Sequence, residues 1–392
     1  MHIDPFLPTL VGIILSILLL GVLLKWIHQP EIIGYLLAGV VVGPHGVGFV
    51  DDPASVNHMG TLGVTLLLFF IGMEVSPRKL VLGWRIAVIG TLLQVFVSVA
   101  LVWVIGSLFD WSLARILLLG FVISLSSTAV VLKLLKDRGE LDTPVGNDVL
   151  LILLAQDMAV VPMLIVLGFL GGSVPTGGTL TLQLIGAVLL IGLGAWLASR
   201  ESIRLPFSER LREDHELQVF AALLACFGMA FITAMLELST ALGAFVGGML
   251  VATARETEWV QHSLESFRTL FVAIFFVSVG LMVDLDFILS HWMQIALLVL
   301  AVLITNTLVN AAVLRALRVS WRRSLLTGAI LAQIGEFSFI LAAAGRQAGI
   351  ITDYAYQSTI ATISISLVLS APWIALARRW FEVASERERK PT

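Results

Sequence analysis

The sequence has few of the residues on which soluble enzymes and disulfide-bonded proteins depend. Of its 392 residues only 13% are charged, and Cys226 is the one cysteine. A single cysteine excludes an intrachain disulfide and a metal site built from a cysteine cluster. No glycine-rich phosphate loop or HExxH motif stands in a suitable context, and no nucleophile, base and orienting residue share a face. We therefore expect neither an enzyme nor a cofactor, and the net charge of −3 predicts no nucleic-acid partner.

What the sequence has instead is a series of apolar runs. Hydrophobic residues make up 58% of the chain, and they fall in runs of about 20 residues rather than in amphipathic stripes. This pattern predicts an all-α, polytopic membrane protein. No basic segment precedes the first run, so we expect a retained helix rather than a signal peptide. We place thirteen spans at residues 6–24, 31–49, 59–75, 86–108, 114–134, 145–170, 180–199, 217–236, 239–254, 270–283, 292–314, 324–345 and 355–377.

The loops between these spans divide the basic residues by side. With thirteen spans, 22 of the 24 Lys and Arg residues follow odd-numbered spans or lie in the C-terminal tail, and only Arg115 and Arg346 lie on the other side. Lys and Arg accumulate in cytoplasmic loops of membrane proteins. The separation predicts a multi-pass protein of the cell inner membrane, with its N-terminus outside and its C-terminus in the cytoplasm.

The chain also contains an internal repeat. A shift of 208 or 209 residues brings related segments together across five spans. The shift equals seven spans, an odd number, so the second copy enters the membrane in the opposite sense. Inverted repeats mark secondary transporters, which bind substrate near the midplane on broken helices. A weak chance alignment of glycine-containing helices is the alternative. The aligned segments include Gly34–Gly39 with Gly243–Gly248 and Gly72–Val75 with Gly280–Val283.

Two spans contain polar segments at positions that the repeat makes equivalent. Hydroxyl groups compete for backbone hydrogen bonds and can satisfy freed carbonyls. If both helices unwind and cross there, two half-helix N-termini meet two C-termini, and Glu336 compensates the positive ends. The hydroxyls alone are equally consistent with ordinary helix packing. The candidate crossover residues are Ser126, Ser127 and Thr128 in span five and Gln333, Gly335 and Glu336 in span twelve.

Asp157 lies within one of the most apolar stretches of the chain, directly after Gln156. A carboxylate at that depth is costly to bury, which makes it a functional hypothesis by default. Either a proton or a monovalent cation can neutralise it, and competition between the two would couple their fluxes. Because Gln156 does not ionise, the site has one titrating acid. We predict a 1:1, electroneutral exchange.

These segments together resemble the monovalent cation/proton antiporter superfamily, in particular the CPA2 branch with the Kef-type potassium/proton antiporters. The resemblance covers nearly the whole chain in order. The segments that carry it are Gly34–Gly39, Phe69–Glu74, Ser124–Ala129, Leu154–Asp157, Ala241–Phe245, Phe275–Gly280 and Gln333–Phe337.

The resemblance implies a sodium/proton antiporter-like fold of about thirteen helices, usually assembled as a homodimer. Spans 1–3 and 8–10 would form a dimerisation scaffold, spans 4–6 and 11–13 a mobile ion-binding core, and span 7 a linker. Asp157 would bind the monovalent cation, with Gln156 as its neutral neighbour and the crossover residues around it. Transport would occur by an elevator-like movement of the core against the scaffold.

The chain departs from the family pattern in two places that matter here. Many relatives place a Lys or Arg in span eleven near the ion-binding acid, whereas the polar residues of this span include Thr305 and Asn306. Kef proteins also continue into a cytoplasmic nucleotide-binding domain. This sequence contains no such domain, which leaves room for a separate cytoplasmic regulatory subunit.

The transported ion and the class of protein are open to more than one reading. We expect K+ ahead of Na+, because a larger, weakly hydrated ion is well served by carbonyls, hydroxyls and the amide of Gln156. A Na+/H+ antiporter is the alternative. A channel-like potassium efflux protein would lack coupled proton flux, and a non-transporting sensor subunit would tolerate Asp157→Asn.

Overall fold

The computed structural model describes most of the chain, and its regular structure is helical. Apart from one isolated parallel bridge between Ile203 and Ala254, regular structure in the described part consists of helices. The predicted all-α fold class is confirmed. Glu74, the end of one family-like segment, lies outside the described residues. The described residues are 6–26, 29–50, 62–63, 65–70, 72–73, 83–171, 177–200, 203, 214–236, 238, 240–254 and 264–388.

The chain divides into two compact units. The first comprises residues 1–49, 79–173 and 280–392, and the second comprises residues 50–78 and 174–279. All the candidate crossover residues and Asp157 belong to the first unit. The division into scaffold, core and linker stays a prediction.

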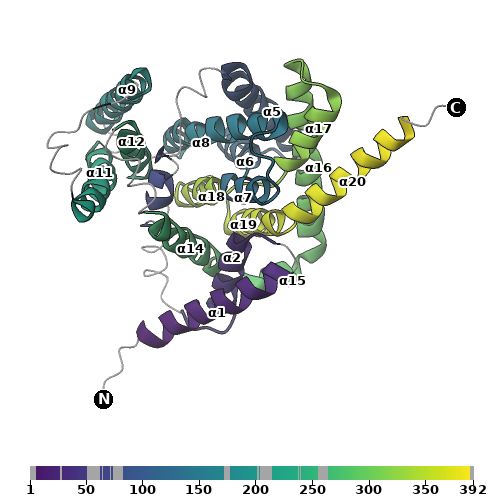
Figure 1. Cartoon of the computed structure of the whole chain (residues 1–392), viewed down its shortest axis with the longest axis horizontal. Helices are drawn as coiled ribbons and strands as arrows, with labels where there is room; N and C mark the ends of the chain where they lie inside the picture. Colours follow the sequence, from purple (N-terminus) through teal and green to yellow (C-terminus); the bar gives the residue numbers. More distant parts are fainter. Residues whose placement is uncertain are drawn as a thin grey trace. The chain divides into compact units, whose positions relative to one another are not determined.

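The first unit contains two broken spans that pack beside the helix carrying Asp157. Helices α6, α7, α8, α18 and α19 lie side by side in Figure 1, and pairs among them are in contact. Buried aliphatic side chains of α7, α8, α17 and α20 form one of its cores. The helices are α1 (Phe6–Trp26), α2 (Glu31–Val42), η1 (Arg85–Gly90), α5 (Thr91–Ser107), α6 (Leu113–Ser124), α7 (Thr128–Asp137), α8 (Pro144–Leu170), α15 (Leu285–Ser290), α16 (Trp292–Ala316), α17 (Trp321–Ile330), α18 (Phe337–Gln347), α19 (Asp353–Val368) and α20 (Ser370–Glu388).

The second unit has its own hydrophobic core. Phe69 and Phe70 from predicted span three pack with Cys226 and other buried residues of α11 and α12. Its helices are α9 (Gly177–Ser199), α11 (His215–Met235), α12 (Thr240–Thr253) and α14 (Glu265–Leu281), of which α14 runs to the boundary with the first unit.

Many apolar side chains of these helices face outward, as a lipid environment requires. Leu19 of α1, Phe96 of α5 and Leu308 of α16 are each more than half exposed. Among the described residues, five helices can cross a membrane by length and composition, with α6 and α7 taken as one, and the bent pair α19 and α20 adds a sixth. Shorter apolar stretches lie in α1, α2, α12 and α14. The protein is multi-pass, and the number thirteen stays a prediction.

Two predicted spans differ from the observed helices, one in where it ends and the other in a bend, and a proline explains each case. Predicted span two continued to residue 49, but α2 ends at Val42, because the residue before Pro44 is disfavoured in helical conformation. Predicted span thirteen was continuous, but α19 and α20 bend by 52° around Leu369. Pro372 cannot donate a hydrogen bond to the carbonyl of Val368, where α19 ends.

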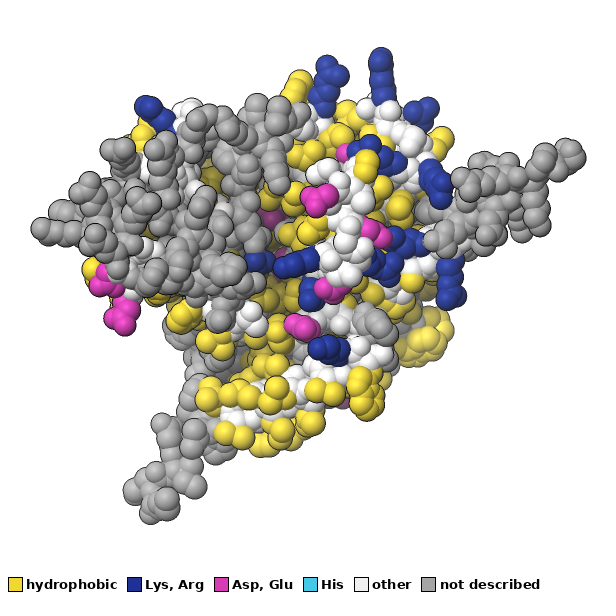
Figure 2. Space-filling view, viewed as in Figure 1, with side chains coloured by type: hydrophobic (Ala, Val, Ile, Leu, Met, Phe, Trp, Pro, Cys, Tyr) yellow, Lys and Arg dark blue, Asp and Glu magenta, His cyan; other side chains and the backbone are white. Residues whose placement is uncertain are grey.

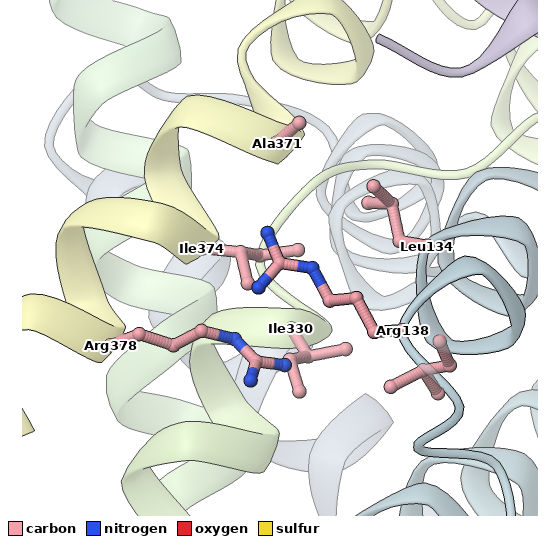
Figure 3. Close-up of a pocket in the computed structure, with 7 residues that line it drawn as sticks. Leu134, Arg138, Ile330, Ala371, Ile374 and Arg378 are labelled. Carbon is pink, nitrogen blue, oxygen red and sulfur yellow. The ribbon is translucent and has the colours of Figure 1, made fainter. Parts of the chain in front are cut away.

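Lys and Arg side chains gather over the ends of α17 and α20 on the face of the first unit seen in Figure 2. Two of these arginines pair with acids near the α7–α8 turn. Arg323 contacts Asp148 at 2.5 Å, and Arg378 contacts Glu140 at 2.5 Å. Figure 3 shows Arg378 and Arg138 extending into a small pocket between the end of α7 and α20. These contacts attach the ends of both broken spans to their neighbours.

Candidate functional site

The two broken spans cross, as the sequence predicted. The first span is interrupted between Ser124 and Thr128 and the second between Ile330 and Phe337. Backbone and side-chain hydrogen bonds join the two interruptions directly. The Gly335 N–H donates to the Leu125 carbonyl at 2.7 Å, and the Ser126 hydroxyl donates to the Leu331 carbonyl at 2.8 Å.

Gly335 permits the close approach of the two backbones. A Cβ atom at this position would lie 2.4 Å from the Ser126 carbonyl oxygen and 2.6 Å from the Ser126 carbonyl carbon. Contacts that short do not occur between unbonded atoms, so any larger side chain would push the interruptions apart. The crossover therefore requires glycine at residue 335.

Two carboxylates lie at the N-terminus of α7, where the helix leaves N–H groups unpaired. The Ala129 N–H donates to Glu336 Oε1 at 3.2 Å. The Thr128 hydroxyl lies 3.1 Å from each carboxylate oxygen of Asp157, and the Ser127 hydroxyl caps the helix by accepting from the Val130 N–H. A helix N-terminus carries partial positive charge and stabilises nearby anions. The predicted compensation of a positive helix end by Glu336 corresponds to this contact.

Asp157 and Gln156 both lie on α8 and are buried, with exposures of 2% and 1%. The side chain of Gln156 is hydrogen-bonded to the backbone of the first interruption. Its carbonyl oxygen accepts from the Ser126 N–H at 2.9 Å, and its amide nitrogen donates to the Ser124 carbonyl at 3.0 Å. Gln156 thus positions the interruption beside Asp157, while its role as an ion ligand stays a prediction.

Gln94 of α5 belongs to the same network, although it is not among the predicted site residues. It is 2% exposed, accepts a hydrogen bond from Gln156 at 2.7 Å and donates to the Ser124 carbonyl at 2.9 Å. The available signal was a lone amide residue within the otherwise apolar run 86–108. Its partners could not be found from sequence, because Gln94 and Gln156 lie on different helices.

Asn306 donates hydrogen bonds to carbonyls at the C-terminal ends of the broken helices, which carry partial negative charge. Its side-chain amide donates to the Ile123 carbonyl at 2.9 Å and to the Ala332 carbonyl at 3.0 Å. These carbonyls lie at the end of α6 and just beyond the end of α17. The neutral amide of Asn306 therefore compensates the partial negative charge of these helix ends. A cationic side chain would also be suited to this role. Thr305, the other polar candidate of this span, is half-buried.

Polar atoms of the second interruption are buried without protein partners. Within the described residues, the amide of Gln333 and the Oε2 atom of Glu336 have no hydrogen-bond partner in the protein, and both side chains are 1% exposed or less. Buried polar groups of this kind normally bind ordered water. We therefore expect this side of the crossover to be hydrated.

The arrangement can hold a small cation or a proton in a largely apolar region. The described polar groups near Asp157 include hydroxyls, amides, the N-terminus of α7 and the Glu336 carboxylate. A cation bound to Asp157 and a proton bound to Asp157 would both neutralise the carboxylate. Such a site suits exchange of one for the other.

A known protein family and several known proteins match most of the chain. Residues 13–377 match the family described as sodium/hydrogen exchanger, transmembrane. The chain is 37% identical over 95% of its length to the iron transporter MagA of Paramagnetospirillum magneticum, of which it covers 85%. It is 33% identical over 95% of its length to K(+) efflux antiporter 5 of Arabidopsis thaliana, of which it covers 68%.

Two further comparisons concern a bacterial relative and the fold. The glutathione-regulated potassium-efflux system protein KefC of Escherichia coli is 28% identical over 92% of the chain, which spans 58% of the length of KefC. The structure of the sodium proton antiporter MjNhaP1 from Methanocaldococcus jannaschii matches 95% of the chain and 98% of its own with a TM-score of 0.68, at 14% identity. At that identity, the likeness shows the fold.

Proposed function

Because the chain belongs to the sodium/hydrogen exchanger family and is a Kef-type cation/proton antiporter domain, we propose that it exchanges K+ for protons in a 1:1, electroneutral cycle. Asp157 binds the two ions in turn. The observation that carries the proposal is the placement of the buried Asp157 carboxylate beside Thr128 and the N-terminus of α7, in the crossover of two broken helices.

The stoichiometry follows from the groups that surround Asp157. Its neighbour Gln156 is neutral, and its side chain is hydrogen-bonded to Ser124, Ser126 and Gln94. The group that α16 directs to the crossover is the neutral amide of Asn306, which releases no proton as a lysine there could. Glu336 accepts a hydrogen bond from a backbone N–H of α7. That carboxylate therefore has a structural partner whether Asp157 holds a proton or a cation. One group then exchanges one proton for one cation.

The ion is proposed from the donors available. Hydroxyl, carbonyl and amide oxygens replace the hydration shell of K+ more readily than that of a smaller, more strongly hydrated ion. The names of two relatives support K+ as the transported ion, because K(+) efflux antiporter 5 and the potassium-efflux protein KefC match most of the chain. The name of MagA raises iron as a cargo. Iron favours imidazole, thiolate or several carboxylates, and the Thr128 hydroxyl beside Asp157 is a poorer ligand for it.

Alternating access and assembly complete the proposal. The core built from spans 4–6 and 11–13 moves against the scaffold built from spans 1–3 and 8–10, and carries Asp157 between the two sides of the inner membrane. The scaffold of one subunit meets that of a second copy in a homodimer. The fold shared with MjNhaP1 and the inverted repeat support this mechanism.

Cation-driven proton flux in proteoliposomes tests the proposal. The full chain is reconstituted with an entrapped pH indicator, and gradients of K+, Na+, Li+, Rb+ or Fe2+ are imposed in turn. We expect K+ and Rb+ to drive proton movement, with Na+ weaker and Fe2+ inactive. Proton movement driven by Na+ in preference to K+ would instead favour the Na+/H+ alternative, and potassium flux without proton movement would identify a channel.

The same vesicles test electroneutrality. A membrane potential imposed without a cation or proton gradient should drive no proton movement, because each cycle moves no net charge. A sustained flux in response to potential alone would contradict the 1:1 stoichiometry and require a second titrating group.

A further inference from the structure

Three side chains of metal-ligand type converge at a place that takes no part in the crossover. His45 lies in the turn that follows α2, and Asp284 and Asp286 lie at the start of α15. One ligand atom of each residue lies within 4.8 Å of the others. The set combines an imidazole and two carboxylates from segments that are far apart in the sequence. By the loop charges, both segments are on the predicted outer side of the membrane.

The spacing of two of these groups differs from that of a hydrogen bond. His45 Nδ1 and Asp284 Oδ1 are 3.6 Å apart, which is longer than a hydrogen bond between nitrogen and oxygen. Two ligands that each lie about 2.0 to 2.1 Å from a tetrahedral metal are about 3.3 Å apart. A small movement would therefore place both atoms on one metal ion. Imidazole with carboxylates suits Zn2+, Mn2+ or Fe2+ rather than K+.

We propose that His45, Asp284 and Asp286 bind one divalent transition-metal ion, with water completing its coordination. The side chains of His45 and Asp284 are 37% and 24% exposed, so an ion from solution can reach them. Asp286 is exposed as well. The three residues together supply one nitrogen and two carboxylates, which is a common number of protein ligands for an accessible metal site.

Backbone packing holds the two segments together before any metal binds. A Cβ atom on Gly280 would lie 2.1 Å from the Leu36 carbonyl oxygen, and both residues belong to the first unit, so their backbones pack directly against each other. The carboxylate of Asp284 is oriented by the Phe287 N–H, which donates to it at 2.9 Å. Pre-organisation of this kind reduces the entropy that binding would otherwise cost.

The site joins the proposed scaffold to the link that leads into the proposed core. His45 follows α2 of the scaffold, and Asp284 and Asp286 lie in the link between α14 of the scaffold and α16 of the core. A metal ion held by both would restrain the core, so we expect bound metal to slow exchange. This consequence rests on the proposed function, but metal binding does not.

Metal titration of the purified full chain in detergent, with any affinity tag removed, tests the site. Isothermal titration with Zn2+ should show one site per chain, and Co2+ should acquire the visible spectrum of a protein-bound ion. His45→Gln and Asp286→Asn should each weaken Zn2+ binding by at least about tenfold. His291→Gln and Asp353→Asn, which change an imidazole and a carboxylate outside the set, should leave it unaltered.

The outcomes separate the site from its effect on transport. Absence of Zn2+ binding below millimolar concentration, or equal binding in all four variants, would overturn the proposal and leave an ordinary surface contact between His45 and Asp284. Zn2+ added outside proteoliposomes should slow K+-driven proton flux in the wild type but not in Asp286→Asn. If Zn2+ binds without slowing that flux, the site stands and the bridging effect fails. If the vesicles show no flux at all, the proposed function fails, and the titration still decides the site.

Discussion

Asp157→Asn is expected to reduce K+-driven proton flux to that of empty vesicles. Asparagine has nearly the shape of aspartate and can still contact the Thr128 hydroxyl, which lies 3.1 Å from both carboxylate oxygens. It carries no charge and binds no proton, so neither ion can replace the other. The loss should therefore be complete rather than partial, and it should occur at every pH. The measurement is the initial rate of proton movement in proteoliposomes.

The control is a matched substitution at an exposed acid of the same unit. Asp137→Asn removes a carboxylate that is 54% exposed and pairs with Lys133 at 3.2 Å. Surface pairs of this kind contribute about 1 kcal/mol or less, so its flux should equal that of the wild type. Both variants should retain the wild-type unfolding temperature to within a few degrees. Substantial flux in Asp157→Asn would mean that another group carries the proton.

Gly335→Ala is expected to destabilise the crossover and to lower flux severely. The new Cβ atom would meet the Ser126 carbonyl oxygen at 2.4 Å, and the neighbouring atoms are backbone that cannot rotate away. Overpacking of a tight site costs about 1 to 3 kcal/mol, and the hydrogen bond from Gly335 to Leu125 would also lengthen. The variant should unfold at a lower temperature in detergent. In the fraction that folds, the N-terminus of α7 should be displaced.

Gly168→Ala provides the control for this substitution. Gly168 lies in α8 of the same unit, and a Cβ atom there would meet nothing within 4 Å. Because alanine is favoured over glycine in a helix by about 1 kcal/mol, this variant should be as stable as the wild type or slightly more so. Equal stability and flux for Gly335→Ala and Gly168→Ala would show that the backbones do not approach as closely as described.

Features governed by local chemistry were predicted from the sequence. The interruptions were placed at Ser126–Thr128 and at Gln333–Glu336, because polar residues inside apolar runs are costly unless they have a structural or functional purpose. The structure confirms the crossed broken helices. The predicted end of span two beyond Pro44 is wrong, and so is the straight course of span thirteen through Pro372. Hydropathy carries no information about the backbone restriction that proline imposes.

Features governed by tertiary contact were not predictable in detail. Asn306 was identified as a polar residue of the core, but its position between two carbonyls of different helices depends on how α6, α16 and α17 pack. Gln94 was missed for the same reason. The metal-ligand set of His45 and Asp284 also joins segments more than two hundred residues apart, and sequence periodicity carries no information about such pairs.

The central claim is that a proton and a cation compete for Asp157, and proton release on cation binding tests it most directly. The purified chain is placed in weakly buffered detergent solution, and K+ is added while the released protons are counted. We expect one proton to be released for each K+ bound in the wild type, and none in Asp157→Asn. Binding of K+ without proton release, or equal release in the two proteins, would contradict the account.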